Sequence, residues 1–208
     1  MDMMNGMDNF YTVSVSAPGK EVNTQADPAV HIHLPCVDLQ DTIPLEPILS
    51  SLFNPKLANG ITGKFSWRLP EKLDHEHHLK RVDEFLHVIK PNFDALPNNQ
   101  KNSLRSFLYV FSGIFGSTSL PVRAMEISMG SELTIGAGTG SSASFAVCLA
   151  GALIQLLKRK TSSDSFDSFY DIGSEEFTMS EKEIISEWAY NCERIMHGTP
   201  SGLISFNT

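Results

Sequence analysis

The chain has 208 residues, 41% of them hydrophobic, which is enough to form one globular domain with a buried core. Its formal net charge is −8 and it contains no Lys/Arg-rich block, which argues against nucleic-acid binding, because that function needs concentrated basic side chains. The three cysteines form no CxxC pair, which argues against a disulfide framework and against a zinc ribbon.

The start of the chain does not read as a secretory signal, because no basic segment is followed there by an apolar one. We expect residues 1–10 to be disordered and residues 11–208 to form one domain. The longest nearly apolar run, residues 143–157, is shorter than the roughly 20 residues that span a bilayer. We therefore expect a cytoplasmic protein that does not bind a membrane.

Two short strands are predicted near the N-terminus, over residues 11–17 and 30–34, because apolar and polar residues alternate in both runs. Residues 40–74 mix proline, asparagine and glycine with scattered apolar side chains, so irregular structure with short helical turns is expected. Residues 120–135 predict a strand, a turn at residues 129–131 and a second strand.

Helical spacing of apolar side chains predicts four helices in the rest of the chain. The last of them opens with the capping-box pattern SEKE at residues 180–183. The acidic segment between the last two helices predicts a surface loop. Strands and helices are mixed without regular βαβ alternation, which indicates the α+β class. The helices are expected over approximately residues 79–89, 100–116, 141–158 and 180–197.

The segment TIGAGTGSSASF, residues 134–145, consists of small residues that lead directly into an apolar helix. Glycines before a helix N-terminus let a phosphate group approach the backbone N–H groups, and serines there can bond a phosphate oxygen or ligate Mg²⁺. No lysine follows the last glycine, so the segment is not a Walker A loop, and its spacing is not that of a dinucleotide fingerprint. The alternative is a flexible connector before a core helix.

Two further segments carry candidate chemistry. SVSAPGK, residues 14–20, holds Lys20 at the tip of a strand, where an ammonium group can neutralise a phosphoryl group; the alternative is an ordinary exposed lysine after a turn. WAYNCERIMHGTPSG, residues 188–202, places Glu193 beside the apolar face of a helix. A carboxylate there can hold Mg²⁺ opposite the serines; the alternative is a solvated, ion-paired glutamate.

Together, and in this order, these segments resemble the GHMP kinase superfamily and, within it, the mevalonate kinases. SVSAPGK resembles the first motif of the superfamily. GAGTGSSAS resembles the phosphate loop P-x3-G-L-G-S-S-A-A, with Thr139 in place of the leucine and Ser144 in place of the second alanine. ERIMHGTPSG resembles the signature E-R-x-x-H-G-x-P-S-G. The resemblance covers most of residues 11–203 and implies the N-terminal GHMP kinase fold, which is similar to ribosomal protein S5 domain 2.

The resemblance implies transfer of the γ-phosphoryl group of ATP to the 5-hydroxyl of a small-molecule substrate, mevalonate, with Mg²⁺ as cofactor. Lys20 would lie near the acceptor hydroxyl, and Ser201 and His197 would contact the substrate. Ser142 and Glu193 would ligate Mg²⁺. A homodimer is a further expectation. The loop around the ATP phosphates would consist of Gly136, Ala137, Gly138, Thr139, Gly140, Ser141 and Ser142.

The chain departs from the family pattern in three places. After Lys20 a block of the pattern is missing, and after Gly202 the chain reads Leu203 and Ile204 where the family has an apolar residue and then an aspartate. We expect the C-terminal domain of the family to be absent from this chain. We therefore expect an incomplete, internally shortened form with weak or no activity. The alternative function is a non-catalytic form that binds ATP weakly or pairs with the full-length enzyme.

Two histidine-rich segments could suggest metal sites. In DHEHH, residues 74–78, adjacent side chains on a helix do not converge on one ion, so a solvated helix start is expected. His31 and His33 share one face of a predicted strand, and a polar sheet face is favoured over a pair of ligands.

Overall fold

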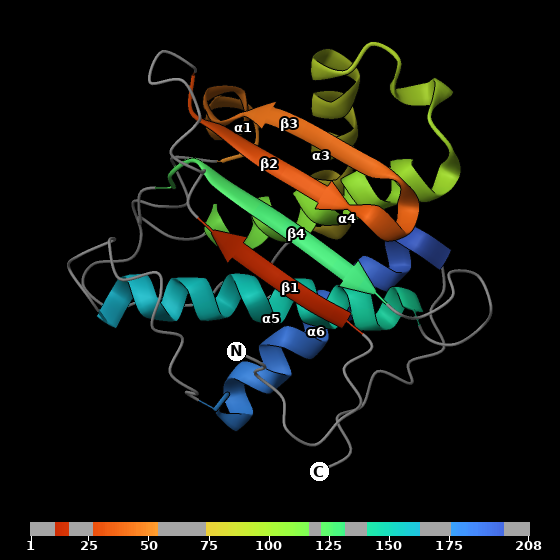
Figure 1. The fold of residues 1–208 in the computed structure, drawn as a ribbon. Helices are drawn as coiled ribbons and strands as arrows, with labels where there is room; N and C mark the ends of the chain where they lie inside the picture. Colours follow the sequence, from red (N-terminus) through yellow and green to blue (C-terminus); the bar gives the residue numbers. More distant parts are fainter. Residues whose placement is uncertain are drawn as a thin grey trace.

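The computed structural model describes residues 11–16, 27–53, 74–116, 122–131, 141–162 and 176–197. Within these residues, one mixed four-stranded sheet has the order β1-β4-β2-β3 (Figure 1). The outer pairs, β1 with β4 and β2 with β3, are antiparallel, and the central pair, β2 with β4, is parallel. The strands are β1 (Tyr11–Ser16), β2 (Ala29–Leu34), β3 (Leu39–Pro44) and β4 (Met125–Ser131).

The helices gather behind one face of this sheet, and α5 runs beside β1 (Figure 1). Side chains of β2 alternate accordingly: Val30, Ile32 and Leu34 are buried, whereas His33 is exposed and His31 is half-exposed. The Nδ1 atom of His31 lies 3.0 Å from the Thr42 hydroxyl on β3, so these histidines belong to a polar sheet face, as the sequence predicts. The helices are α1 (Leu45–Ser51), α3 (His75–Ile89), α4 (Asn98–Phe115), α5 (Ser141–Ser162) and α6 (Met179–His197).

Helix α4 is the centre of the core, because it contacts α3, α5 and α6 and is almost wholly buried from Ser103 onward. Its approach to α6 is close at Gly113, where an added Cβ would lie 2.3 Å from the Trp188 ring. Tyr109 meets the same indole edge-on, with ring centroids 5.9 Å apart. Glycine is therefore required at position 113 for α6 to pack at this distance.

The sheet differs from the sequence-based expectation at two places. Residues 39–44 form β3, although irregular structure is predicted, because only Leu39 and Ile43 of this edge strand are buried and the apolar signal is weak. Strand β4 continues through the predicted turn at residues 129–131. Gly130 pairs with Thr12, so hydrogen bonding to β1 keeps this glycine in an extended strand.

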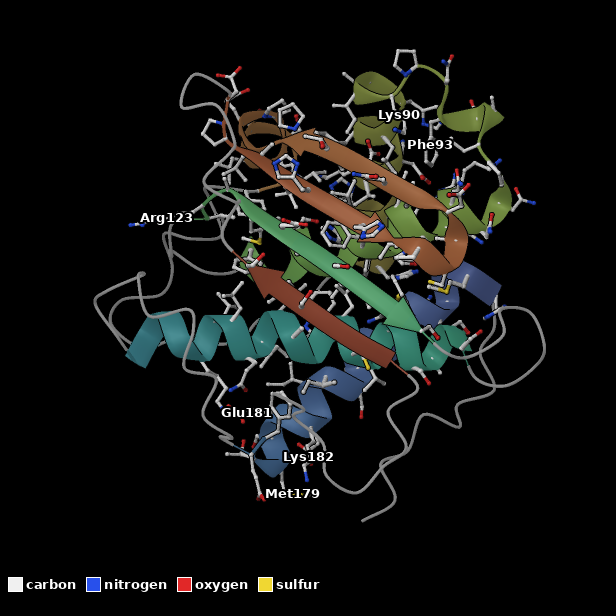
Figure 2. The ribbon with its side chains drawn as sticks, in the orientation of Figure 1. Lys90, Phe93, Arg123, Met179, Glu181 and Lys182 are labelled. Carbon is white, nitrogen blue, oxygen red and sulfur yellow. The ribbon has the colours of Figure 1, made fainter. Side chains whose placement is uncertain are left out.

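The start of α6 is capped two residues earlier than the sequence predicts. The Thr178 hydroxyl accepts a 3.3 Å hydrogen bond from the Glu181 N–H, and the Glu181 carboxylate accepts one of 2.8 Å from the Thr178 N–H. These reciprocal bonds form a capping box. Lys158 of α5 lies 3.0 Å from the same carboxylate, so this end of α6 is also joined to α5. Figure 2 labels Glu181 at this end of α6.

Helix α5 extends slightly beyond its predicted end near Lys158. By length and composition, its segment Ser141–Lys158 could cross a membrane, and within the described residues it is the one helix that meets this criterion. Half of the segment is buried inside the fold, and α5 packs against β1, α4 and α6. Such packing is typical of the core helix of a globular domain.

Candidate functional site at the facing ends of α5 and α6

Four of the sequence-predicted site residues lie in the described part of the chain, at the ends of two packed helices. Ser141 and Ser142 begin α5, whereas Glu193 and His197 belong to the last turns of α6. The remaining predicted site residues lie outside the described residues, and these are Lys20, Gly136, Ala137, Gly138, Thr139, Gly140 and Ser201.

The first turn of α5 and the last turn of α6 meet through a side-chain hydrogen bond. The Ser142 Oγ atom lies 2.9 Å from the Nε2 atom of His197, although 55 residues separate them in sequence. Packing of the two helices brings them together, since Gly151 of α5 faces Ile185 of α6 and buried apolar side chains line both helices. The structure therefore brings the serines at the start of α5 against the end of the ERIMH motif.

Glu193 lies on the same face of α6 as His197, because residues four apart on an α-helix are neighbours one turn apart. Its Oε1 atom is buried and has no hydrogen-bond partner among the described residues. A buried carboxylate oxygen without a donor is unfavourable unless a cation or another donor satisfies it. Glu193 is thus suited to hold a cation near the end of α6.

These residues fit a magnesium ion that is shared with a nucleotide. Within the described residues, no cluster of three or more His, Cys, Asp or Glu side chains could hold a metal by itself. Magnesium bound to nucleotide phosphates needs only one or two protein carboxylates, so Glu193 and the Ser142 hydroxyl would be sufficient protein ligands.

The start of α5 also favours an anion at this site. The N-terminus of α5 carries a partial positive charge, and its first turn holds no acidic residue. His197 lies in the last turn of α6, whereas the Arg194 side chain lines a groove along α3 instead. Next to Glu193, burial raises the pKa of the Cys192 thiol to about 12, so this thiol is protonated near neutral pH and serves as a core side chain rather than a nucleophile.

The DHEHH segment differs in part from its prediction as a solvated helix start. The Asp74 carboxylate caps α3 by accepting a 3.0 Å bond from the His77 N–H, and His77 is exposed. His78, however, is buried and donates through Nε2 to the Tyr109 carbonyl at 3.1 Å. His75 lies 2.9 Å from the Tyr109 hydroxyl. The missed signal is that His78 lies four residues before buried Val82, on the apolar stripe of α3.

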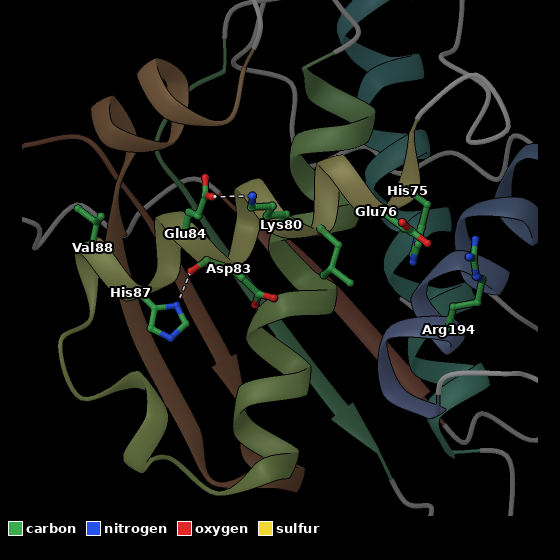
Figure 3. A pocket seen from close by; sticks show the side chains of 9 residues that line it. His75, Glu76, Lys80, Asp83, Glu84, His87, Val88 and Arg194 are labelled. Carbon is green, nitrogen blue, oxygen red and sulfur yellow. Dashed lines mark hydrogen bonds and ion pairs between the residues drawn. The ribbon is translucent and has the colours of Figure 1, made fainter.

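A separate open groove of about 780 Å³ runs along α3, and Figure 3 shows its side chains. Arg194 reaches it from α6, but it contains none of the sequence-predicted site residues. Three carboxylates face two permanent cations there, and Lys80 lies 3.8 Å from Glu84. This balance does not suit phosphate groups, which bind where positive charge is in excess. The lining residues are His75, Glu76, Leu79, Lys80, Asp83, Glu84, His87, Val88 and Arg194.

Comparison with known proteins connects the helix-end site to a family. Residues 105–205, which include the greater part of α4, all of β4, α5 and α6, and both motifs, match the family described as GHMP kinases N terminal domain. Over these residues the chain is similar to the N-terminal domain of GHMP kinases. The mixed sheet with helices on one face agrees with the α+β class predicted from the sequence.

Curated relatives extend the match over nearly the whole chain. Mevalonate kinase of Dictyostelium discoideum is 28% identical over 216 aligned positions, which cover 97% of this chain and 52% of the relative. Mevalonate kinase of Mus musculus is 30% identical, covering 91% of this chain and 50% of the relative. Over a shorter stretch of 101 residues, or 47% of this chain and 24% of the relative, mevalonate kinase of Bos taurus is 38% identical. The chain spans about half the length of the first two relatives.

Proposed function

We propose that this chain contributes an ATP-dependent phosphoryl transfer to an alcohol, and that the alcohol is mevalonate, which becomes 5-phosphomevalonate. One observation supports the proposal: the 2.9 Å contact between Ser142 and His197 links the serines at the start of α5 to the ERIMH motif at the end of α6. The names of the relatives supply the substrate. The reaction would provide a precursor for isoprenoid and sterol synthesis.

In this proposal, the described site residues bind phosphate oxygens or Mg²⁺. The N-terminus of α5 with Ser141 and Ser142 would bind phosphate oxygens, and Ser142 and Glu193 would hold Mg²⁺, which when bound neutralises charge on the phosphates. Lys20 would neutralise the acceptor side. Phosphoryl transfer depends mostly on such positioning and electrostatic stabilisation, so a backbone cradle, one carboxylate and one lysine are sufficient parts.

A second candidate function is ATP binding without turnover, alone or in a pair with a full-length enzyme. The observation that favours it is the sequence Leu203–Ile204 after the ERIMHGTPSG motif, where the resembled pattern has an aspartate. The loss of one acid–base group lowers a rate by about 10²–10⁴-fold. This second function keeps the nucleotide site and predicts very slow product formation. The cytoplasmic setting and the homodimer stay predictions.

The experiment that separates the two functions is a phosphorus NMR assay of the full chain with ATP, Mg²⁺ and mevalonate. Formation of a phosphomonoester together with ADP, lost in Ser142→Ala and kept in Ser50→Ala, supports phosphoryl transfer. Ser50 is a matched control because it is an exposed serine on α1, where its hydroxyl donates to the Pro47 carbonyl. Nucleotide binding without phosphomonoester supports the second function, and the absence of both contradicts the proposal.

A further inference from the structure

His197 contacts a residue proposed to bind Mg²⁺ and nucleotide, and this contact suggests a role for the histidine other than substrate binding. We propose that His197 is a positioning residue that orients the Ser142 hydroxyl and thereby acts on nucleotide binding. The inference rests on the proposed function, because it concerns the same site. It differs from the sequence-based expectation, in which His197 contacts the acceptor alcohol.

The chemistry of a serine hydroxyl explains why a positioning partner matters. The group has one proton and two lone pairs, and it rotates freely unless a neighbour fixes it. Ser142 and Glu193 can both offer oxygen lone pairs to a cation only if the Ser142 proton points elsewhere. The His197 Nε2 atom, 2.9 Å away, is an acceptor for that proton. We therefore assign the proton of this hydrogen bond to Ser142 and the unprotonated nitrogen to Nε2 of His197.

The position of the imidazole is set by the core rather than by solvent. His197 ends α6, and one turn and more before it Ala189 and Cys192 are completely buried against the rest of the core. Contacts with α4 and α5 hold this helix along its length. The backbone of His197 is therefore held relative to the first turn of α5, and the exposed side chain reaches Ser142 from that fixed position. An anchored acceptor can hold a mobile hydroxyl in one orientation.

The first test measures Mg·ATP dissociation constants of the full chain by calorimetry, for His197→Ala, His197→Gln, Ser142→Ala and the double variant. Loss of one hydrogen bond predicts about fivefold weaker binding for His197→Ala. The glutamine amide can replace Nε2 as an acceptor, so His197→Gln should recover most of the affinity. The double variant should bind no more weakly than Ser142→Ala. His77→Gln, an exposed histidine on α3, is the matched control and should bind as the wild type does.

The second test needs neither nucleotide nor activity. Long-range ¹H–¹⁵N spectra of the ligand-free chain at one fixed pH report which ring nitrogen of His197 carries the proton. The inference predicts an unprotonated Nε2 whose nitrogen shift changes in Ser142→Ala and stays the same in Ser50→Ala. Unchanged His197 signals in Ser142→Ala would overturn the inference.

The outcomes distinguish this inference from the proposed function. Binding of Mg·ATP by the wild type, with additive losses in the double variant or no loss in His197→Ala, overturns the positioning role alone. If the wild type is active, the KM values of His197→Ala give a further test. A raised KM for the alcohol with an unchanged KM for Mg·ATP also overturns the positioning role and supports a contact between His197 and the acceptor alcohol. No binding of Mg·ATP by the wild type overturns the proposed function and, with it, the role of His197.

Discussion

Helix α6 takes part in two regions of different character, the core around α4 and the site at the start of α5. In the core, Trp188 is completely buried and lies directly over Gly113, where no side chain fits. At the site, Ser142 and His197 are partly or fully exposed, and Glu193 holds a buried oxygen without a partner among the described residues. Helix α6 is thus closely packed on its core face, whereas its end at the site holds a buried polar atom that has no hydrogen-bond partner among the described residues.

This difference divides the residues expected to determine stability from those expected to determine ligand binding. Close packing stabilises the α4–α6 contact, and substitutions there should unfold the protein. Polar groups without partners are unfavourable in the unliganded fold, and they become useful when a ligand satisfies them. Core variants should therefore change the free energy of unfolding, whereas site variants should change ligand binding and leave stability nearly unchanged.

The largest effect is expected for Trp188→Ala. Removal of this completely buried indole leaves a cavity between α4 and α6, and the free energy of unfolding should fall by about 4 kcal/mol. Urea denaturation followed by circular dichroism measures the change. Exposed Tyr190→Ala on the same helix is the control and should change stability by less than about 1 kcal/mol. Equal losses in both variants would contradict the packing described for Trp188.

Gly113→Ala should destabilise the fold by about 2 kcal/mol, because the new methyl group overlaps the Trp188 ring. Trp188→Phe shortens that ring and should remove part of the overlap. A double-mutant cycle by urea denaturation is the measurement, and it should give a favourable coupling between the two substitutions. Additive effects would mean that the side chains at positions 113 and 188 do not overlap sterically.

The capping box at the start of α6 predicts a smaller effect. Thr178→Ala removes the hydroxyl that accepts from the Glu181 N–H, and stability should fall by about 1 kcal/mol. Ser180→Ala changes the position that the sequence pattern favours and should have almost no effect. Thermal melts of both variants compare their losses of stability. A larger loss in Ser180→Ala than in Thr178→Ala would support the cap predicted from the sequence.

The histidines of α3 predict opposite dependences of stability on pH. Burial, with Arg194 as a second cause, lowers the pKa of His75, so the unfolded chain binds its proton more readily. This group therefore reduces stability as pH falls below the ordinary histidine value of about 6.5. The Asp83 carbonyl, followed by Asp94, raises the pKa of His87, so His87 adds stability that is lost as pH rises through its folded pKa.

Urea denaturation between pH 5 and 8 checks these signs. His75→Gln should flatten the loss of stability on acidification, whereas His87→Gln should steepen it. The two variants serve as controls for each other, because both remove one histidine from the same helix. A shift of the same sign in both would contradict the environments described for the two side chains.

The smallest effect on stability, and the largest on binding, is expected for Glu193→Gln. Removing the charge from a carboxylate whose Oε1 is buried without a partner should leave the free energy of unfolding unchanged or raise it by up to about 1 kcal/mol. Stabilisation by Mg·ATP should be lost. Glu183→Gln, exposed near the start of α6, is the control and should keep that stabilisation. A large drop in stability for Glu193→Gln would identify the carboxylate as a structural group.

Helices and most strands could be predicted from the sequence, because their apolar side chains repeat with a clear period. The helix over His75–Ile89 and the strand over Ala29–Leu34 are examples. Strand β3 could not be predicted in this way, since an edge strand buries few side chains, and the course of β4 through Gly130 depends on pairing with β1. Tertiary hydrogen bonds determine these elements, and local patterns do not reveal them.

The candidate site could be predicted only as separate motifs. The sequence identifies Ser142, Glu193 and His197 as candidates, but their proximity depends on the packing of α5 against α6 across 55 residues. The same holds for His78, whose partner Tyr109 lies on another helix. The local pattern identifies candidate residues, whereas which of their atoms meet depends on the core.

The most direct test of the central claim, that the start of α5 and the end of α6 form one nucleotide site, is a thermal-shift titration of the full chain with ATP, with and without Mg²⁺. We predict a Mg²⁺-dependent rise in Tm that disappears in both Ser142→Ala and Glu193→Gln and remains in Ser50→Ala and Glu183→Gln. A rise that survives in either site variant, or no rise in the wild type, would contradict the claim.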